Sequence, residues 1–324
     1  MKSSSEKFYR HKERENRLNK LKNKKKVFYD FPLSKAFSLD KNEYNDLCNV
    51  CNIYLWESLK HSFPKKQYSL NNKIFYDHLE DILKLPNRTP NGMIVPYFEN
   101  FKSYNLIHDT LSTILEKNGF IDHFSEIQST FKIRVISNKI KGKAVNRETS
   151  SFKIHTDIWS SEPISHLLIN IPILGNSKEI GINFFHPEQD LSGFNMSLDN
   201  YGKAENLLKK IKPYKMLFNK GLMFFSDAYA LHQTFVSQKI ARKKIDGRLS
   251  IDIRVIFKNL LPNEKKTKNR KTPENYIPVN QWKKFSRNQI LVNRWRINSF
   301  IKKKEKKQTK KENIGIKFCE YSKG

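Results

Sequence analysis

The stretch from residue 131 to residue 257 constrains the fold most, because it consists of short Ile-, Val-, Phe- and Leu-rich runs separated by clusters of Gly, Asn, Pro, Ser and Lys. Short runs of β-branched and aromatic residues bounded by turn formers are typical of strands. About eight strands are predicted on this pattern, over residues 131–137, 152–159, 166–174, 181–185, 216–218, 222–225, 230–237 and 248–257. Strands that follow one another at this spacing indicate a mainly β fold, a sandwich or a closed barrel.

Helices are predicted on both sides of this region. Residues 73–83 and 106–115 carry apolar side chains at helical spacing, with Pro86 and Gly119 as end signals. A short helix is predicted over residues 199–211, and a basic helix packed on the β core over residues 281–307. Four regions follow: a basic flexible arm (1–26), a helical region packed on the barrel (27–130), the β core (131–260), and a basic C-terminal helix and tail (261–324).

The formal net charge of +29 is concentrated at the two ends of the chain. Residues 1–26 hold 11 Lys and Arg against 3 Asp and Glu, and residues 263–324 hold 19 against 5. Such clusters can bind nucleic acid or another polyanion, but they also fit solvated tails. The aromatic and glycine signature of an RNA-binding sheet does not accompany them. A polyanion is therefore a partner that the composition allows but does not favour.

Cysteine usage and the N-terminal sequence indicate a cytoplasmic protein. The three cysteines, Cys48, Cys51 and Cys319, are too few and too scattered for a disulfide framework. The first 26 residues contain no apolar segment of the signal-peptide kind, and no apolar run approaches the roughly 18 to 20 residues of a membrane span. The oligomeric state is not indicated.

The strongest chemical signal is the tripeptide His155-Thr-Asp157, followed about 75 residues later by His232. Residues two apart on a strand share one face, so His155 and Asp157 can offer ligands to a single ion. His232 ends an apolar run that starts at Gly221, and it can supply the third ligand. Two imidazoles and one carboxylate on one side of an ion leave the other side open, which is the arrangement of non-haem iron(II) oxygenases.

Arg248 and Ser250 open the last predicted strand and share one of its faces. A dicarboxylate co-substrate that chelates iron through its keto-acid end presents a remote carboxylate, for which an arginine fork and a hydroxyl are suitable partners. The other interpretation is a solvated polar face, shared with Asp252 and Arg254. Arg248 is the first candidate for the anchor, with Arg254 and Arg242 as alternatives.

At these positions the sequence resembles the 2-oxoglutarate/iron(II) dioxygenases, specifically the phytanoyl-CoA-dioxygenase-like branch and its relatives beside carbohydrate and antibiotic biosynthesis genes. The resemblance covers about residues 130 to 257. It rests on four segments: His155-Thr-Asp157-Ile-Trp159 with Pro163 after it, Leu167-Leu-Ile-Asn170-Ile-Pro172, Gly221 to His232, and Arg248-Leu-Ser250-Ile-Asp-Ile-Arg254.

The resemblance implies a double-stranded β-helix (a cupin-like jelly roll) with the metal in the mouth of the barrel. It also implies Fe(II), O2 and 2-oxoglutarate as cofactor and co-substrates, with succinate and carbon dioxide as co-products. The segment after Pro172 lacks the acidic, glycine-rich signature ending in Gly-Ser-His that many members carry, which bears on the substrate more than on the chemistry.

The sequence therefore predicts a 2-oxoglutarate-dependent hydroxylase of a small molecule, sugar-linked or phosphorylated, with His155, Asp157 and His232 as catalytic metal ligands. One alternative is the same chemistry on a nucleic acid or protein docked by the basic ends. Another is a cupin-like metal-binding barrel without oxygen chemistry.

Overall fold

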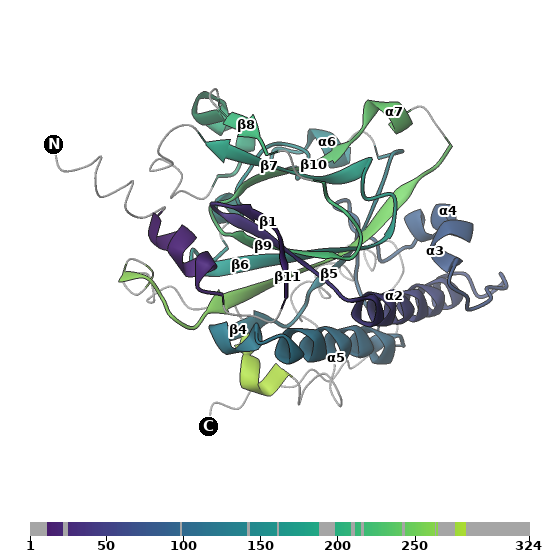
Figure 1. Ribbon diagram of the computed structural model, residues 1–324. Coiled ribbons are helices and arrows are strands. Elements are labelled where there is room, and N and C mark those ends of the chain that lie inside the picture. Colours follow the sequence, from purple (N-terminus) through teal and green to yellow (C-terminus); the bar gives the residue numbers. More distant parts are fainter. Residues whose placement is uncertain are drawn as a thin grey trace, which may run out of the picture.

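The computed structural model describes residues 12–21, 25–97, 99–140, 143–160, 162–187, 198–208, 211–214, 217–241, 244–262, 264 and 276–282. Two β-sheets face one another within this part of the chain, and all their strand pairs are antiparallel (Figure 1). The larger sheet runs in the order β1 (Val27–Phe31), β2 (Ser34–Ser38), β9 (Leu222–Asp227), β6 (His166–Gly175), β11 (Gly247–Phe257), β4 (Phe124–Gln128) and β12 (Tyr276–Pro278). Its β11 also pairs with β5 (Lys132–Ser137), which pairs with β3 (Met93–Ile94). The smaller sheet consists of β10 (Leu231–Val236), β7 (Ile180–Pro187) and β8 (Ile211–Pro213).

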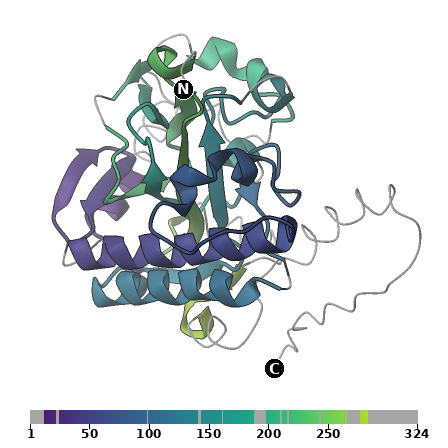
Figure 2. The ribbon, with the colours of Figure 1, turned by 90° about the vertical axis from the view of Figure 1, so that its right-hand side faces the viewer.

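Two long helices, α2 (Lys41–Ser62) and α5 (Phe101–Lys117), lie side by side along the outer face of the larger sheet (Figures 1 and 2). A capping box starts α2, in which Asp40 and Glu43 exchange side-chain and backbone hydrogen bonds. Gly119 follows α5 with a φ of 80°, a conformation that suits glycine at the end of a helix. The shorter helices are α3 (Ile74–Asp77), α4 (Leu79–Leu83), α6 (Lys143–Asn146) and α7 (Gln238–Ala241).

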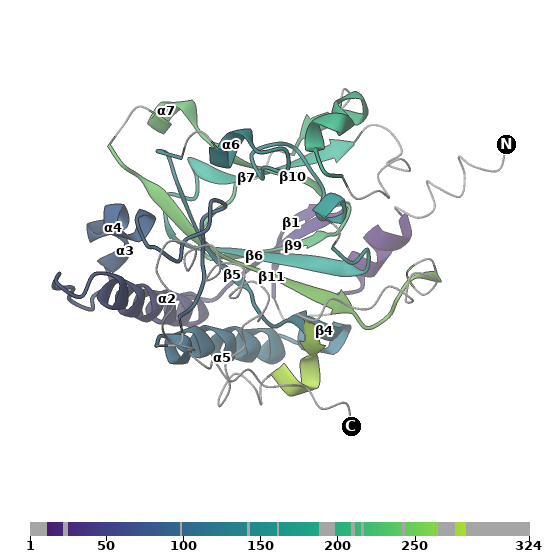
Figure 3. The same cartoon turned by 180° about the vertical axis from the view of Figure 1, so that it is seen from behind.

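Alternation along β11 separates a helix-facing core from the space between the sheets. Leu249, Ile251, Ile253 and Val255 pack in the main hydrophobic cluster together with α2 and α5. The intervening residues therefore face the smaller sheet, which lies on the other side of β6 and β11 (Figure 3). A second cluster, which includes Ile182, Phe184 and Phe224, fills part of that space.

The mainly β architecture with flanking helices is confirmed, and six predicted strands appear as β5, β6, β7, β9, β10 and β11. The helix over 106–115 is confirmed as part of α5, whereas 73–83 divides into α3 and α4. The jelly-roll connectivity and the four-region division stay predictions.

Other predicted elements were wrong in detail. Residues 152–159 form no strand: His155 makes an isolated bridge, and Asp157–Ser160 is a 3-10 helix. The helix over 199–211 is a 3-10 helix over Tyr201–Leu208. The region predicted to be helical from residue 27 opens instead with the hairpin of β1 and β2, which pairs with β9 and extends the larger sheet. Residues 217 and 218 are not in a strand, and most of 281–307 lies outside the described residues.

The N-terminal arm differs most from its prediction. Residues 12–19 are helical, and both Arg14 and Arg17 are buried against Asp227 and Glu264. Four ion pairs of 2.6–3.3 Å join these side chains. The helix docks because two buried carboxylates of the β core need cationic partners, which local sequence patterns do not reveal.

Among the described helices, none combines the length and the apolar composition needed to cross a bilayer.

Candidate metal centre

The segment before the metal tripeptide runs along the free edge of β10. Ser151 accepts a hydrogen bond from the backbone of Thr234 at 2.7 Å, and His155 and His232 exchange two backbone hydrogen bonds of 3.0 and 2.9 Å. Backbone pairing of this kind sets directly opposed side chains close together. Two histidines 77 positions apart in the sequence therefore lie next to one another, with their ring centroids 4.4 Å apart.

Asp157 completes the cluster from the 3-10 turn that follows the bridge. His155, Asp157 and His232 each offer one potential ligand atom, and these three atoms lie within 4.8 Å of one another. All three residues are buried. Modest side-chain rotations would bring these atoms onto a single ion. The structure thus brings the predicted residues together, although a turn rather than an alternating strand directs the carboxylate.

Both imidazoles are oriented by their own backbone. Nδ1 of His155 lies 2.8 Å from the carbonyl oxygen of Lys153, and Nδ1 of His232 lies 3.0 Å from that of Ala230. Because a carbonyl only accepts, each Nδ1 must carry the proton, which leaves the lone pair of each neutral ring on Nε2. Burial lowers the pKa of His155 to about 3, with a further contribution from His232, and burial also lowers the pKa of His232. Both rings are therefore neutral at physiological pH, as metal ligands must be.

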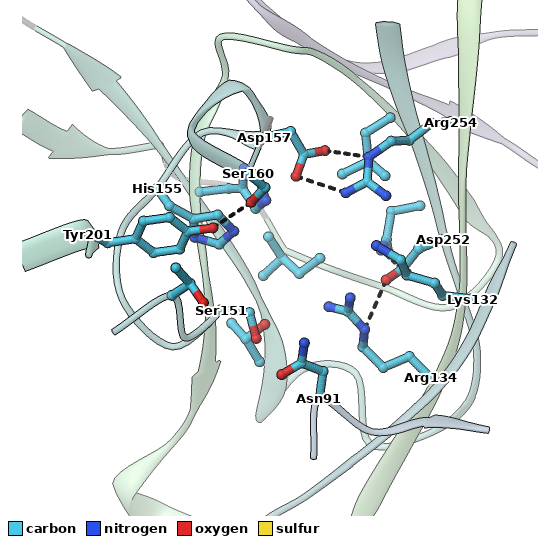
Figure 4. Close-up of a pocket in the computed structure, with 16 residues that line it drawn as sticks. Asn91, Lys132, Arg134, Ser151, His155, Asp157, Ser160, Tyr201, Asp252 and Arg254 are labelled. Atoms are coloured by element: carbon cyan, nitrogen blue, oxygen red, sulfur yellow. Dashed lines mark hydrogen bonds and ion pairs between the residues drawn. The ribbon is translucent and has the colours of Figure 1, made fainter. Parts of the chain in front are cut away.

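Asp157 is held in its ionised form. Burial alone would raise the pKa of Asp157, but Arg254 and His166 hold it well below its ordinary value. Oδ2 accepts from Arg254 Nε at 3.0 Å, and Oδ1 accepts from Arg254 Nη2 at 3.0 Å (Figure 4). Oδ2 also accepts from His166 Nε2 at 3.1 Å. Each carboxylate oxygen has about two acceptor positions, so one on Oδ1 is left for a metal. This set of two imidazole nitrogens and one carboxylate oxygen fits a divalent iron ion.

Arg248 lies deep in the space between the sheets. Its side chain is fully buried, and none of its three guanidinium nitrogens has a hydrogen-bond partner among the described residues. Its nearest aromatic contact is the ring of Phe218, 4.8 Å from the guanidinium carbon. Desolvation lowers the pKa of Arg248 to about 10, with Asp252 acting in the opposite direction. A buried charge without a partner is costly, so this position fits an anionic ligand.

The rest of the polar face of β11 is buried as well, so the solvated-face interpretation is wrong. Ser250 donates to Asp252 at 3.2 Å, and Arg254 is engaged by Asp157 and by Glu162. Arg254 therefore already has two carboxylate partners, which makes it a weaker candidate for the co-substrate anchor than Arg248. Arg242, the other alternative, lies outside the described residues.

The residues around this centre that sequence reasoning missed are Asn91, Lys132 and Arg134, which line the pocket with the metal cluster (Figure 4). Lys132 and Arg134 alternate with apolar residues on β5, a signal present in the sequence but also shown by any half-exposed strand. Asn170 also lines the pocket, Trp159 packs against Tyr201, and Tyr229 lies under the guanidinium of Arg14.

No known family model matches the sequence, and no curated protein matches it. Several solved structures match the chain at low identity. One is the non-heme alpha-ketoglutarate-dependent epimerase SnoN from nogalamycin biosynthesis, with 11% identity, coverage of 76% of this chain and 82% of that chain, and a TM-score of 0.33. Another is the non-heme alpha-ketoglutarate-dependent carbocyclase SnoK from the same biosynthesis, with 8% identity, coverage of 71% of this chain and 90% of that chain, and a TM-score of 0.37. A third is an N-substituted L-amino acid dioxygenase from Burkholderia ambifaria AMMD, with 12% identity, coverage of 69% of this chain and 82% of that chain, and a TM-score of 0.31. With every TM-score below 0.5, the case for a function rests on the residues of this chain.

Proposed function

We propose that this chain is an Fe(II)- and 2-oxoglutarate-dependent oxygenase that hydroxylates a small molecule. The observation that carries the proposal is the conjunction of a buried His155, Asp157 and His232 cluster with a buried Arg248 that has no hydrogen-bond partner among the described residues. A metal cluster alone would fit many metalloproteins. A metal cluster with a separate unpartnered cation in the same barrel interior fits an anionic co-substrate that spans the two.

In this proposal each residue has a defined task. His155 and His232 would hold the ion through Nε2, and Asp157 through Oδ1. Arg254 and His166 orient the carboxylate, and Arg248 with Ser250 would bind the distal carboxylate of 2-oxoglutarate. When bound, Fe(II) with O2 and 2-oxoglutarate supplies oxidative decarboxylation to succinate and carbon dioxide together with hydroxylation of the substrate.

The finer assignments belong to the same proposal: a double-stranded β-helix of the phytanoyl-CoA-dioxygenase-like branch in the cytoplasm, with residues 131–260 as the catalytic core. Two sheets that face one another across the site, with helices on the outer face of one, support the double-stranded β-helix among these assignments.

The decisive experiment is an anaerobic titration of the protein with Fe(II) and 2-oxoglutarate, in which the visible metal-to-ligand charge-transfer band is recorded. We expect the band in wild type and its loss in Asp157→Ala. His61→Ala, which removes a partly exposed histidine paired with Glu99, serves as the matched control and should keep the band.

A folded wild type without the band would contradict the proposal. If the band appears but no substrate screen yields succinate from 2-oxoglutarate under oxygen, the cupin-like barrel without oxygen chemistry becomes the better interpretation.

A further inference from the structure

We infer that the pocket beside the metal cluster binds the oxyanion of a small polar substrate, a carboxylate or a phosphate, through Lys132 and Arg134. This inference rests on the proposed function and adds the substrate class to it. The wall of the pocket is the first support. Of the 16 residues drawn around it, Leu168 and Ile182 are the two aliphatic ones, and the others are polar or charged (Figure 4). A wall that is polar over most of its lining gives a hydrocarbon or acyl chain little apolar surface to pack against, so it favours a polar molecule.

The strand register puts both basic residues on the inner face of the larger sheet. Arg134 is paired with Ser250, and Lys132 with Asp252, in the antiparallel ladder between β5 and β11. Paired residues in such a ladder point to the same side, so Lys132 and Arg134 share the face that carries Arg248. In Figure 4 the guanidinium of Arg134 points into the pocket, across from His155 and Tyr201.

Arg134 contacts Asp252 through Nε, which leaves its two terminal guanidinium nitrogens as further hydrogen-bond donors. Its Nε lies 3.2 Å from Oδ2 of Asp252. Asp252 also accepts hydrogen bonds from Asn170 and Ser250, so this carboxylate does not depend on Arg134 alone. The terminal nitrogens of Arg134 form a fork that matches two oxygens of a carboxylate or phosphate.

Charge balance in the loaded site also calls for an anion. The charges of Fe(II) and the 2-oxoglutarate dianion cancel. The described side chains around them then leave at least one positive charge in excess, from Lys132, Arg134, Arg248 and Arg254 against Asp157, Glu162 and Asp252. An excess charge in a mostly buried site is stabilised by an anionic ligand. Asn91 and the hydroxyl groups of Ser151 and Tyr201, which line the same pocket, are suited to the uncharged polar part of such a molecule.

The test uses simple anions as probes on the full chain loaded anaerobically with Fe(II) and saturating 2-oxoglutarate. Sulfate stands in for a phosphate, acetate for a carboxylate and glycerol for a neutral polar molecule. Binding is measured by calorimetry at constant ionic strength in wild type, Lys132→Gln and Arg134→Gln. Lys84→Gln removes an exposed positive charge elsewhere and serves as the control. Thermal unfolding of each variant verifies folding, and Lys132→Gln stays informative if Arg134→Gln fails to fold.

Sulfate or acetate should bind wild type and the control variant with similar affinity. Each pocket variant should bind the same anion roughly tenfold more weakly, since a charge-assisted hydrogen bond contributes on this scale. Preference for sulfate identifies a phosphate substrate, preference for acetate a carboxylate. The inference is overturned if neither anion binds, if glycerol binds equally well, or if binding is unchanged in both pocket variants.

The charge-transfer band separates this inference from the proposed function. A wild-type band without anion binding would remove the inference and leave the proposed function. Loss of the band in Arg134→Gln, with retention in Arg248→Met, would overturn the inference by making Arg134 the anchor of 2-oxoglutarate.

Discussion

Arg248 and Arg254 lie on one strand, face the same side and are both buried, yet their surroundings differ. Arg254 has carboxylate partners on two sides, in Asp157 and Glu162. Arg248 has no hydrogen-bond partner among the described residues. A paired buried charge stabilises the fold through its partner, whereas an unpaired one costs stability and is explained by a ligand.

We expect Arg248→Met to stabilise the ligand-free protein by on the order of 1 kcal/mol, because a buried charge without a partner is replaced by an apolar chain of similar length. The same variant should lose the stabilisation that 2-oxoglutarate gives to the Fe(II)-loaded wild type. Thermal unfolding with and without 2-oxoglutarate measures both effects. Arg254→Met is the matched comparison and should destabilise by about 3 kcal/mol, since it leaves the buried Asp157 without its guanidinium partner and with His166 as its remaining donor. A destabilised Arg248→Met that still responds to 2-oxoglutarate would contradict the role of Arg248.

Replacement of Arg254 should also change how strongly a metal stabilises the fold. In Arg254→Gln the buried carboxylate of Asp157 loses its guanidinium partner and keeps the hydrogen bond from His166. A bound divalent ion would then neutralise a negative charge that Arg254 already balances in wild type. We expect the rise in melting temperature on addition of Ni(II) to be larger in Arg254→Gln than in wild type, and absent in Asp157→Ala. An equal rise in Arg254→Gln and wild type would show that Arg254 does not act on the metal site.

At the scale of elements, the short helix over residues 12–19 is tied to the end of β9. Arg14 and Arg17 both contact Asp227, five positions before His232 in the chain. Asp227 also accepts a hydrogen bond from the backbone of Tyr229 at 3.0 Å, within the turn that leads to β10. The helix therefore holds the turn that leads to the candidate ligand His232, although none of its described residues lines the pocket beside the His155, Asp157 and His232 cluster.

Asp227→Asn should destabilise the protein by about 3 kcal/mol at neutral pH, because two buried guanidinium groups lose one of their two carboxylate partners. Burial would raise the pKa of Asp227, but Arg14 and Arg17 hold it below its ordinary value. The stabilisation that ionised Asp227 gives to the folded state is therefore fully present above the pKa of about 3.9 that an aspartate has in the unfolded chain. It is lost as the pH falls through the lower pKa of Asp227 in the folded state. Denaturant unfolding should show a constant difference from wild type above about pH 5 that narrows below about pH 4. A difference that grows on acidification would refute this assignment.

Over the whole molecule, part of the basic charge near the N-terminus has a structural role. The N-terminal end contributes Arg14 and Arg17 to buried ion pairs, so part of its charge serves the fold. The described residues end at 282, before most of the basic residues that follow position 263. The net charge of the chain is thus a poor guide to its partners, because it includes basic residues whose charge is used in buried ion pairs.

Deletion of residues 1–21 should destabilise the protein by several kcal/mol, because Asp227 and Glu264 would stay buried without Arg14 and Arg17. Deletion of residues 306–324 should leave the melting temperature and the Fe(II) and 2-oxoglutarate band unchanged. Once a substrate is known, the same C-terminal deletion separates two classes: turnover of a small molecule persists, while an enzyme docked on a polymer loses apparent affinity and salt dependence. A stable protein without residues 1–21 would show that the buried ion pairs contribute little.

The candidate ligand types, their order along the chain and the alternation of β11 could all be read from local sequence, because side-chain chemistry and the two-residue period of a strand are local properties. The helix over 106–115, part of α5, is likewise predicted from apolar residues at helical spacing. Three features come from contacts between distant segments: Asp157 projects from a turn, residues 12–19 dock on the β core, and Arg254 has carboxylate partners. Arg248, by contrast, has no hydrogen-bond partner among the described residues. These outcomes depend on which charges from distant segments meet in the interior, and the free energy of such a pair is defined only once both partners have left water.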